Sequence, residues 1–160
     1  MTNLSSTLGQ DFSRFYQRVA EQIRELVEPL STEQLWFRPY PYGNSIGHLL
    51  LHLTGNLNHY VGAEMARTGY VRDRPLEFSD PSHPAKELVV KNFLAAIATV
   101  IDTLDKQLET DWTTAFSSKG MEDAGDRFTA FLRCAAHVYQ HMGQIIYLSK
   151  EIARQSEQVL

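Results

Sequence analysis

Cysteine is almost absent from this sequence, since Cys134 is the only one among 160 residues. A lone cysteine cannot form a disulfide within the chain, and it rules out CxxC metal or redox motifs. The first residues, MTNLSSTLGQDF, lack the basic segment and apolar run of a secretory signal. No stretch reaches the roughly 18 consecutive apolar residues that a membrane span requires. We therefore expect a cytoplasmic protein with no membrane partner.

Clusters of basic residues are also missing. Lys and Arg number 15 against 19 Asp and Glu, so the formal net charge is −4, and the cations are scattered. Nucleic-acid-binding domains usually carry a basic patch or stripe, so we expect no nucleic-acid partner. Runs that alternate apolar and polar residues are few, and no β-sheet is predicted. The length and the ordinary composition, 43% hydrophobic, indicate a single domain over residues 1–160.

Four segments instead place apolar residues at alternating steps of three and four, the spacing of amphipathic helices. They cover residues 4–30, 44–68, 84–108 and 126–155. Pro29 disfavours continuation of the first helix, Asn44 or Ser45 can cap the second, and Gly69 can end it. Pro84 suits the start of the third helix.

Two connections between these helices are long. The segment VRDRPLEFSDPSHP, between the second and third helices, is charged, rich in proline and without periodicity. The segment TDWTTAFSSKGMEDAGD precedes the fourth helix, and compact domains rarely keep such loops without a use. The pattern predicts an all-α fold, a four-helix bundle with a long crossover between helices 2 and 3.

The fourth helix contains the segment HVYQH, in which His137 and His141 lie one turn apart on an apolar face. Two such imidazoles can each direct a nitrogen at one ion about 2 Å away. The third ligand of a mononuclear site would then be His48, His52 or His59, from the second helix. Core histidines bonded to backbone carbonyls are the common alternative. The sequence has no HExxH motif for a zincin protease and no Glu-x-x-His pair for a di-iron bundle.

The second helix carries a strip of imidazoles and small side chains beside its apolar stripe. The strip consists of His48, His52, Gly55, His59, Gly62 and Ala66. Small residues allow close approach by another helix or by a ligand. Cys134 is interpreted as a small buried hydrophobe rather than a ligand, and His83 as an exposed loop residue.

Three segments, LSTEQLWFRPYPYGNSIGHLLLHLTGNL, RDRPLEF and HVYQHMGQIIYLSK, resemble the DinB-like superfamily of bacterial four-helix proteins. The nearest branch is catalogued only as a domain of unknown function. The resemblance implies that a second-helix histidine, three residues before a Gly-Asn pair, joins an HxxxH pair on one divalent metal. These positions correspond to His52, before Gly55 and Asn56, and to His137 and His141.

The same resemblance leaves further residues with predicted roles around the metal. His48 would contact one of the metal ligands without binding the metal itself, or act as an alternative ligand. His59 would line the pocket or the surface. Asn56 or Gln144 would orient an imidazole through its second nitrogen. Residues Arg72 to Phe78 of the crossover would pin that connection by ion pairs. Glu64, Asp73 and Glu77 have no predicted place near the metal.

Three protein ligands leave a coordination position open, as in catalytic rather than structural sites. Relatives in the superfamily include transferases and isomerases that use a low-molecular-weight thiol, such as bacillithiol or mycothiol. The resemblance therefore implies a thiol-dependent transferase in which a metal-activated sulfur attacks a small-molecule substrate. The alternatives are a metal-dependent hydrolase that uses metal-bound water and a non-enzymatic, stress-related binding bundle. Zn, Ni, Fe and Mn all accept imidazole, and the relatives suggest a homodimer.

Overall fold

The structure is a computed structural model that describes residues 4–157. Residues 1–3 and 158–160, which the sequence assigns to the same domain, lie outside the described part. Four long helical segments form the body: α1 (Leu4–Val27), α3 (Ile46–Leu57) continued by the π-helix η1 (Asn58–Ala63), α5 (Lys86–Asp105) and α6 (Arg127–Glu157). Three short helices lie in the connections: α2 (Thr32–Trp36), α4 (Leu76–Ser79) and the 3-10 helix η2 (Glu109–Asp111).

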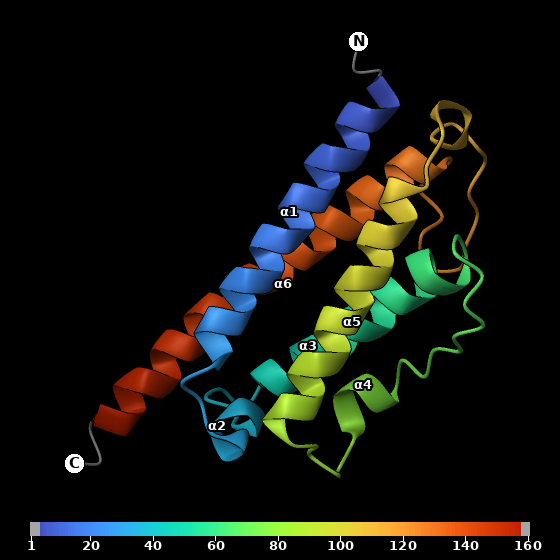
Figure 1. Cartoon of the computed structure of the whole chain (residues 1–160). Helices are drawn as coiled ribbons and strands as arrows, with labels where there is room; N and C mark the ends of the chain where they lie inside the picture. The colour runs from blue at the N-terminus through green and yellow to red at the C-terminus, as the bar shows by residue number, and fades with distance from the viewer. Residues whose placement is uncertain (1–3, 158–160) are drawn as a thin grey trace.

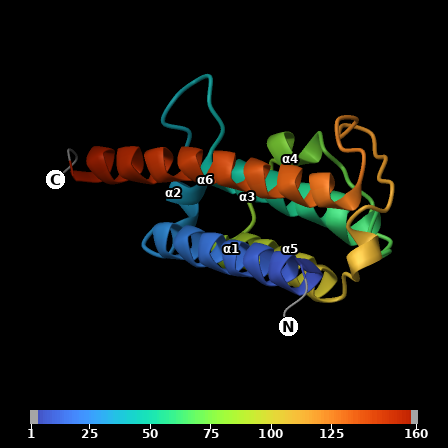
Figure 2. The same ribbon diagram turned by 90° about the horizontal axis from the view of Figure 1, so that it is seen from above.

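The four long helices pack as a bundle of two layers. Helices α1 and α5 lie side by side in one layer, and α6 and α3 lie in the other (Figures 1 and 2). Each layer contacts the other, because α1 also packs on α6 and α3 also packs on α5. Within residues 4–157 no strand forms; Ala115 and Asp126 make an isolated antiparallel bridge. The predicted all-α four-helix fold is confirmed.

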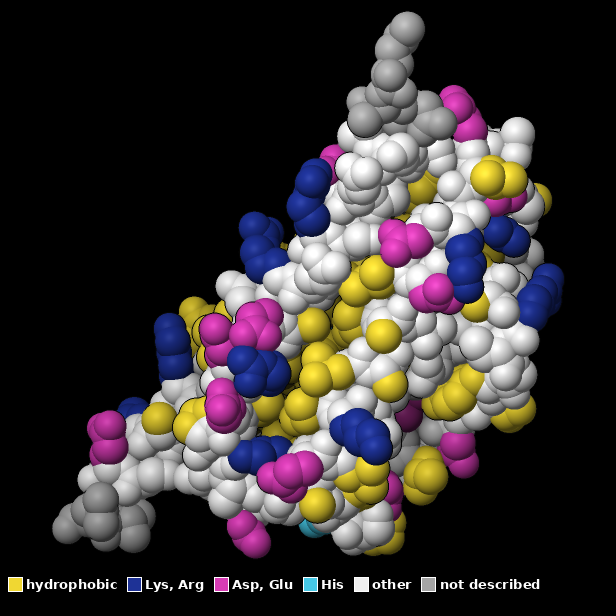
Figure 3. All heavy atoms as spheres, in the orientation of Figure 1, with side chains coloured by type: hydrophobic (Ala, Val, Ile, Leu, Met, Phe, Trp, Pro, Cys, Tyr) yellow, Lys and Arg dark blue, Asp and Glu magenta, His cyan; other side chains and the backbone are white. Residues whose placement is uncertain are grey.

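Apolar stripes from all four helices meet in the core. Tyr16, Leu50, Phe93 and Phe131 are among the large side chains that are almost fully buried. In Figure 3 hydrophobic side chains gather along the line between α1 and α5, and charged side chains are scattered over the rest of that face. The hydrophobic periodicity of the sequence therefore marks the faces on which the helices pack.

The loop before α6 is tied to the core by one aromatic side chain. The Nε1–H group of Trp112 donates to Ser5 Oγ at 2.9 Å, and the indole stacks on Phe12 with ring centroids 6.1 Å apart. Trp112 is 4% exposed, so it holds the beginning of this loop against α1. The rest of the loop is thereby brought beside η1, where Tyr60 Oη donates to the Lys119 carbonyl at 3.2 Å.

Helix ends differ from the predicted ones in ways that local chemistry explains. Ser45, not Asn44, caps α3, because its Oγ accepts the His48 N–H at 3.2 Å. The second long helix ends at Ala63, short of the predicted Thr68, and Arg67 then takes a left-handed φ of 58°. The third ends at Asp105, so Leu108 lies beyond it and is exposed.

The long crossover between α3 and α5 is confirmed, and it is not free of the bundle. Its short helix α4 packs against α3, and Arg72 Nε donates to Glu77 Oε1 at 2.6 Å in a buried ion pair. Among the described residues, no helix has the length and apolar character needed to cross a membrane.

Candidate metal centre

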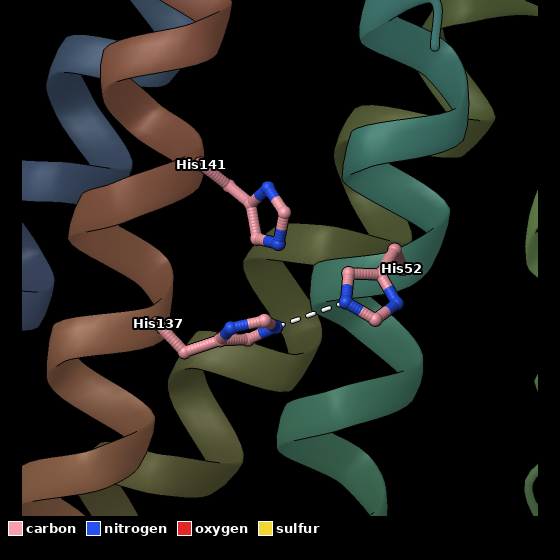
Figure 4. A group of neighbouring side chains, drawn as sticks. All are labelled: His52, His137 and His141. Atoms are coloured by element: carbon pink, nitrogen blue, oxygen red, sulfur yellow. Dashed lines mark hydrogen bonds between the residues drawn. The ribbon is translucent and has the colours of Figure 1, made fainter. Parts of the chain in front are cut away.

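Three histidines from two helices converge at the interface between α3 and α6. His52 lies on α3, and His137 and His141 lie one turn apart on α6 (Figure 4). One ring nitrogen from each residue lies within 4.8 Å of the other two. His52 Nε2 and His137 Nε2 are 2.9 Å apart. Two nitrogens bound at about 2.0 Å to one tetrahedral ion lie roughly 3.3 Å apart, so this spacing is close to what one ion requires.

His52 is oriented by a buried carboxylate from the crossover. Its Nδ1–H donates to Glu77 Oε2 at 2.8 Å, because a carboxylate oxygen can only accept. In the neutral form of the ring this leaves the lone pair on Nε2, the nitrogen that faces His137 in Figure 4. Glu77 also accepts from Arg72 Nε at 2.6 Å and from Arg72 Nη2 at 2.9 Å. A carboxylate behind a histidine is the usual partner of a metal-binding imidazole.

The ionisation of Glu77 depends on these same contacts. Burial raises the pKa of a carboxyl group, but the hydrogen bonds from His52 and Arg72 and the charge of Arg72 outweigh it and leave the Glu77 pKa lowered. The carboxylate is therefore negative near neutral pH and balances the guanidinium next to it. The expectation that Glu77 has no fixed place near the metal is wrong, since it touches His52 directly.

His141 is oriented by a neighbour on its own helix. Its Nδ1–H donates to Gln144 Oε1 at 2.6 Å, and Figure 4 shows the other nitrogen pointing toward His137 and His52. The pKa of His141 is lowered, mainly by burial. Burial, with the nearby imidazoles and Arg72, lowers the pKa of His137 to about 4. The α6 pair is therefore neutral at pH 7, the form that binds metals.

Gly55 explains how the crossover reaches so close to α3. A Cβ at this position would lie 2.0 Å from Glu77 Oε1 and 2.8 Å from its Cδ. No side chain larger than hydrogen fits while the carboxylate stays in place. Gly62 is likewise approached from within the chain, by Thr68 Oγ1. The close contacts on this predicted small-residue strip are thus made by the protein itself.

His48 faces away from the cluster. Its Nε2 accepts from Arg38 Nη2 at 3.3 Å and its Nδ1 lies 2.5 Å from Ser45 Oγ, so both nitrogens are engaged. Its ring packs edge-on against Trp36, which also stacks on the exposed His83. The structure does not bring His48 to the position predicted for an alternative ligand.

The remaining predicted residues fall into different surroundings. Gln144 orients His141 as described, whereas the buried Oδ1 of Asn56 has no hydrogen-bond partner among residues 4–157. His59 lines a cavity, as expected of a pocket wall, and its Nε2 lies 3.4 Å from Ser118 Oγ. Cys134 is fully buried, and burial raises the pKa of its thiol to about 12. Such a thiol behaves as a hydrophobic core residue.

A cavity of about 750 Å³ opens beside the cluster. His52 and His137 form part of its wall, and residues of the crossover and of the loop before α6 complete it. Gln140 of α6 also lines it. Two imidazoles are thus reachable from a space large enough for a small molecule.

Comparisons with known proteins give a family and a fold. The model of the family described as "Protein of unknown function (DUF1572)" matches residues 5–160. A search of curated proteins finds no match. A solved structure described as "Crystal structure of the conserved protein of locus from Enterococcus faecalis" is similar, with a TM-score of 0.74 and 15% identity. The match covers 96% of this chain and 99% of that one, and at this identity it establishes the fold alone.

Proposed function

This chain belongs to the family of proteins of unknown function DUF1572, and we propose that it is a metal-binding, thiol-dependent transferase. The metal ligands are His52, His137 and His141, and the metal is a divalent transition ion such as Zn, Ni, Fe or Mn. The substrate is a small molecule that enters through the cavity beside the cluster.

One observation carries this proposal. Ring nitrogens from three histidines on two helices lie within 4.8 Å of one another, and two of these rings line a cavity of about 750 Å³. Glu77 and Gln144 leave Nε2 of His52 and of His141 free to act as ligands. Protein ligands on one side and open space on the other are typical of a catalytic metal rather than a structural one.

The choice of a thiol rests on the DinB-like motifs of the sequence and on the side chains around the cluster. A bound metal would supply a Lewis acid that lowers the pKa of a thiol or a water molecule at the open position. A hydrolase also needs a general base that accepts a proton from the attacking water. The carboxylate in contact with the cluster, that of Glu77, already accepts hydrogen bonds from His52 and Arg72. A thiol must also lose a proton, but its pKa of about 8.5, against about 15.7 for water, lets solvent take that proton without a protein base, so transfer is favoured over hydrolysis.

Metal content tests the ligand set. Elemental analysis of untagged protein is expected to give one transition metal per chain, and His137→Ala is expected to lose it. His83→Ala serves as the control, because His83 is exposed and stacks on Trp36 away from the cluster. Wild-type protein that retains no metal after supplementation with Zn, Ni, Fe or Mn would overturn the proposal.

Thiol binding tests the reaction class. In cobalt-substituted protein, a small thiol that binds the metal adds a sulfur-to-cobalt charge-transfer band in the near ultraviolet. We expect this band with wild-type protein. If the spectrum does not change and model esters are hydrolysed, the function is hydrolysis by metal-activated water. If neither happens, the metal only stabilises a binding bundle.

A further inference from the structure

The cavity beside the histidine cluster has an unusual set of charges. Its wall contains four basic side chains: Arg72, Arg74, Lys119 and Arg133. No Asp or Glu is among its lining residues, although the whole chain has a net charge of −4. A concave wall of one sign, in a protein of the opposite sign, favours a ligand that carries the missing charge.

Two of these four cations already have a carboxylate partner. Arg72 is paired with Glu77 at 2.6 Å, and Arg133 Nε lies 2.9 Å from Asp123 Oδ2. Arg74 and Lys119 make no ion pair or hydrogen bond with any side chain in residues 4–157. The pKa of the nearby Glu122 carboxyl is nevertheless lowered, mainly by backbone hydrogen bonds and in part by the charge of Lys119. The cavity therefore retains two cations that are not held in ion pairs, one from the crossover and one from the loop before α6.

The position of Lys119 is fixed by the fold. Its carbonyl accepts from Tyr60 Oη at 3.2 Å, and Gly120 follows with a left-handed φ of 86°. A Cβ at Gly120 would lie 2.7 Å from Tyr60 Oη, so the loop and η1 are in close contact here. The loop thus holds one cation at the cavity, and the crossover holds another.

A buried amide supplies a second and independent sign of a ligand. Asn56 lines the same cavity, is 7% exposed, and has a buried Oδ1 without a hydrogen-bond partner among the described residues. Such a group costs about 1–3 kcal/mol when it stays unsatisfied. A ligand with an N–H or O–H group in the cavity would satisfy it once the amide turns its oxygen toward the cavity that Asn56 lines.

We propose that the cavity binds a small molecule with an anionic group and a hydrogen-bond donor. Arg74 and Lys119 bind the anion, Asn56 Oδ1 accepts from the donor, and the reactive end faces His52 and His137. The orientation of the reactive end rests on the proposed function, whereas the binding of the anion does not.

Two thiols of matched size test the preference for an anion. Mercaptopropionate and mercaptopropanol are titrated into cobalt-substituted protein, and the charge-transfer band gives an apparent Kd for each. We expect the anionic thiol to bind about tenfold more tightly, the scale of two partly exposed charge pairs. This ratio should fall as salt increases.

A matched pair of double variants separates local charge from net charge. R74Q/K119Q is expected to bring the ratio close to one. R18Q/K91Q makes the same change in net charge at exposed positions on α1 and α5, and it should keep the wild-type ratio. Equal Kd values in the wild type, or an unchanged ratio in R74Q/K119Q, would overturn the proposal.

A metal-free arm distinguishes failure of this proposal from failure of the proposed function. Propionate, lactate and inorganic phosphate are titrated into metal-free protein while the backbone amide signals of Lys119 and Gly120 are followed by NMR. We expect saturable shifts, tighter binding of lactate than of propionate, and loss of that difference in Asn56→Leu.

Saturation by phosphate alone would identify the anion as a phosphate. If no thiol band forms but these shifts appear, only the metal chemistry fails; if no anion shifts these signals, the anion site does not exist.

Discussion

Glu77 joins two parts of the site that are distant in the sequence. The residue is 6% exposed, and its carboxylate accepts from both His52 and Arg72. Since an unpaired buried charge is very costly, this three-residue arrangement is stable only when all its members are present. The crossover is thereby fixed to α3 at the residue that orients a proposed metal ligand.

Replacing Glu77 with Gln removes the charge while keeping a similar shape. We expect Glu77→Gln to weaken zinc binding by about 10–100-fold, since carboxylate partners of histidine ligands contribute on that scale. Competition with a chromophoric chelator measures the affinity. Glu87→Gln, at an exposed position on α5, is the control. Unchanged affinity in Glu77→Gln would mean that the carboxylate only pins the crossover.

Gly55 makes the same arrangement possible, so its replacement should act through Glu77. The added Cβ in Gly55→Ala would lie 2.0 Å from Glu77 Oε1, so the carboxylate must move away from His52. We expect zinc affinity to fall as in Glu77→Gln, and the G55A/E77Q double variant to be no worse than either alone.

Gly143→Ala is the matched control for Gly55→Ala. Gly143 is also helical, but a Cβ there would meet nothing within 4 Å. This substitution should leave zinc affinity unchanged and raise the free energy of unfolding by up to about 1 kcal/mol. Additive losses in G55A/E77Q would contradict a shared cause.

Part of the site follows from local sequence and part does not. His137 and His141 share a face because they are four residues apart on a helix, and the DinB-like resemblance selected His52 from three candidates. Glu77 was not predicted, because its position depends on the path of a crossover without periodicity. The available signal was Gly55, a helix-breaking residue in the middle of an apolar helix that requires close approach by another group.

At the scale of elements, the periodicity located the four long helices but not their irregularities. The change from α-helix to π-helix at Asn58 has no counterpart in the hydrophobic pattern. A π-helix alters the face on which later residues lie, so the sequence left His59 open between the pocket wall and the surface, and the structure places it at the cavity. The long loop before α6 was expected to have a use, and it supplies one wall of that cavity.

Helix α3 carries His52, and its start depends on the Ser45 cap. The Ser45 Oγ atom accepts the His48 N–H at 3.2 Å and contacts His48 Nδ1. We expect Ser45→Ala to lower the free energy of unfolding by about 1 kcal/mol, measured by urea denaturation. Ser117→Ala, in the exposed loop before α6, should change it by less than about 0.5 kcal/mol. Equal effects would show that the cap does not stabilise α3.

At the scale of the whole molecule, the association state stays a prediction. The superfamily resemblance implies a homodimer, but Gly55 and Gly62 are approached by residues of the same chain, so these two glycines are not where a partner helix would pack closely. We expect sedimentation equilibrium at high micromolar concentration to give twice the 18.2 kDa mass of the chain. A single species at the monomer mass would contradict the prediction.

The bundle itself links metal binding to global stability. His52 belongs to α3, and His137 and His141 belong to α6, so one ion would bridge the two helices of a layer. An ion bound only by the folded state stabilises it by about 2.7 kcal/mol at a free concentration of 100 times Kd. We therefore expect zinc to raise the thermal midpoint of metal-free protein, and chelation to reverse the change.

His137→Ala should remove this response, because it leaves two ligands on separate helices. Unlike wild type, its midpoint should be the same with zinc and with chelator in differential scanning calorimetry. His83→Ala should respond like wild type. If zinc raises the midpoint of His137→Ala as much as that of wild type, the stabilising ion binds elsewhere on the protein, and the three-histidine cluster does not join α3 to α6 through a metal.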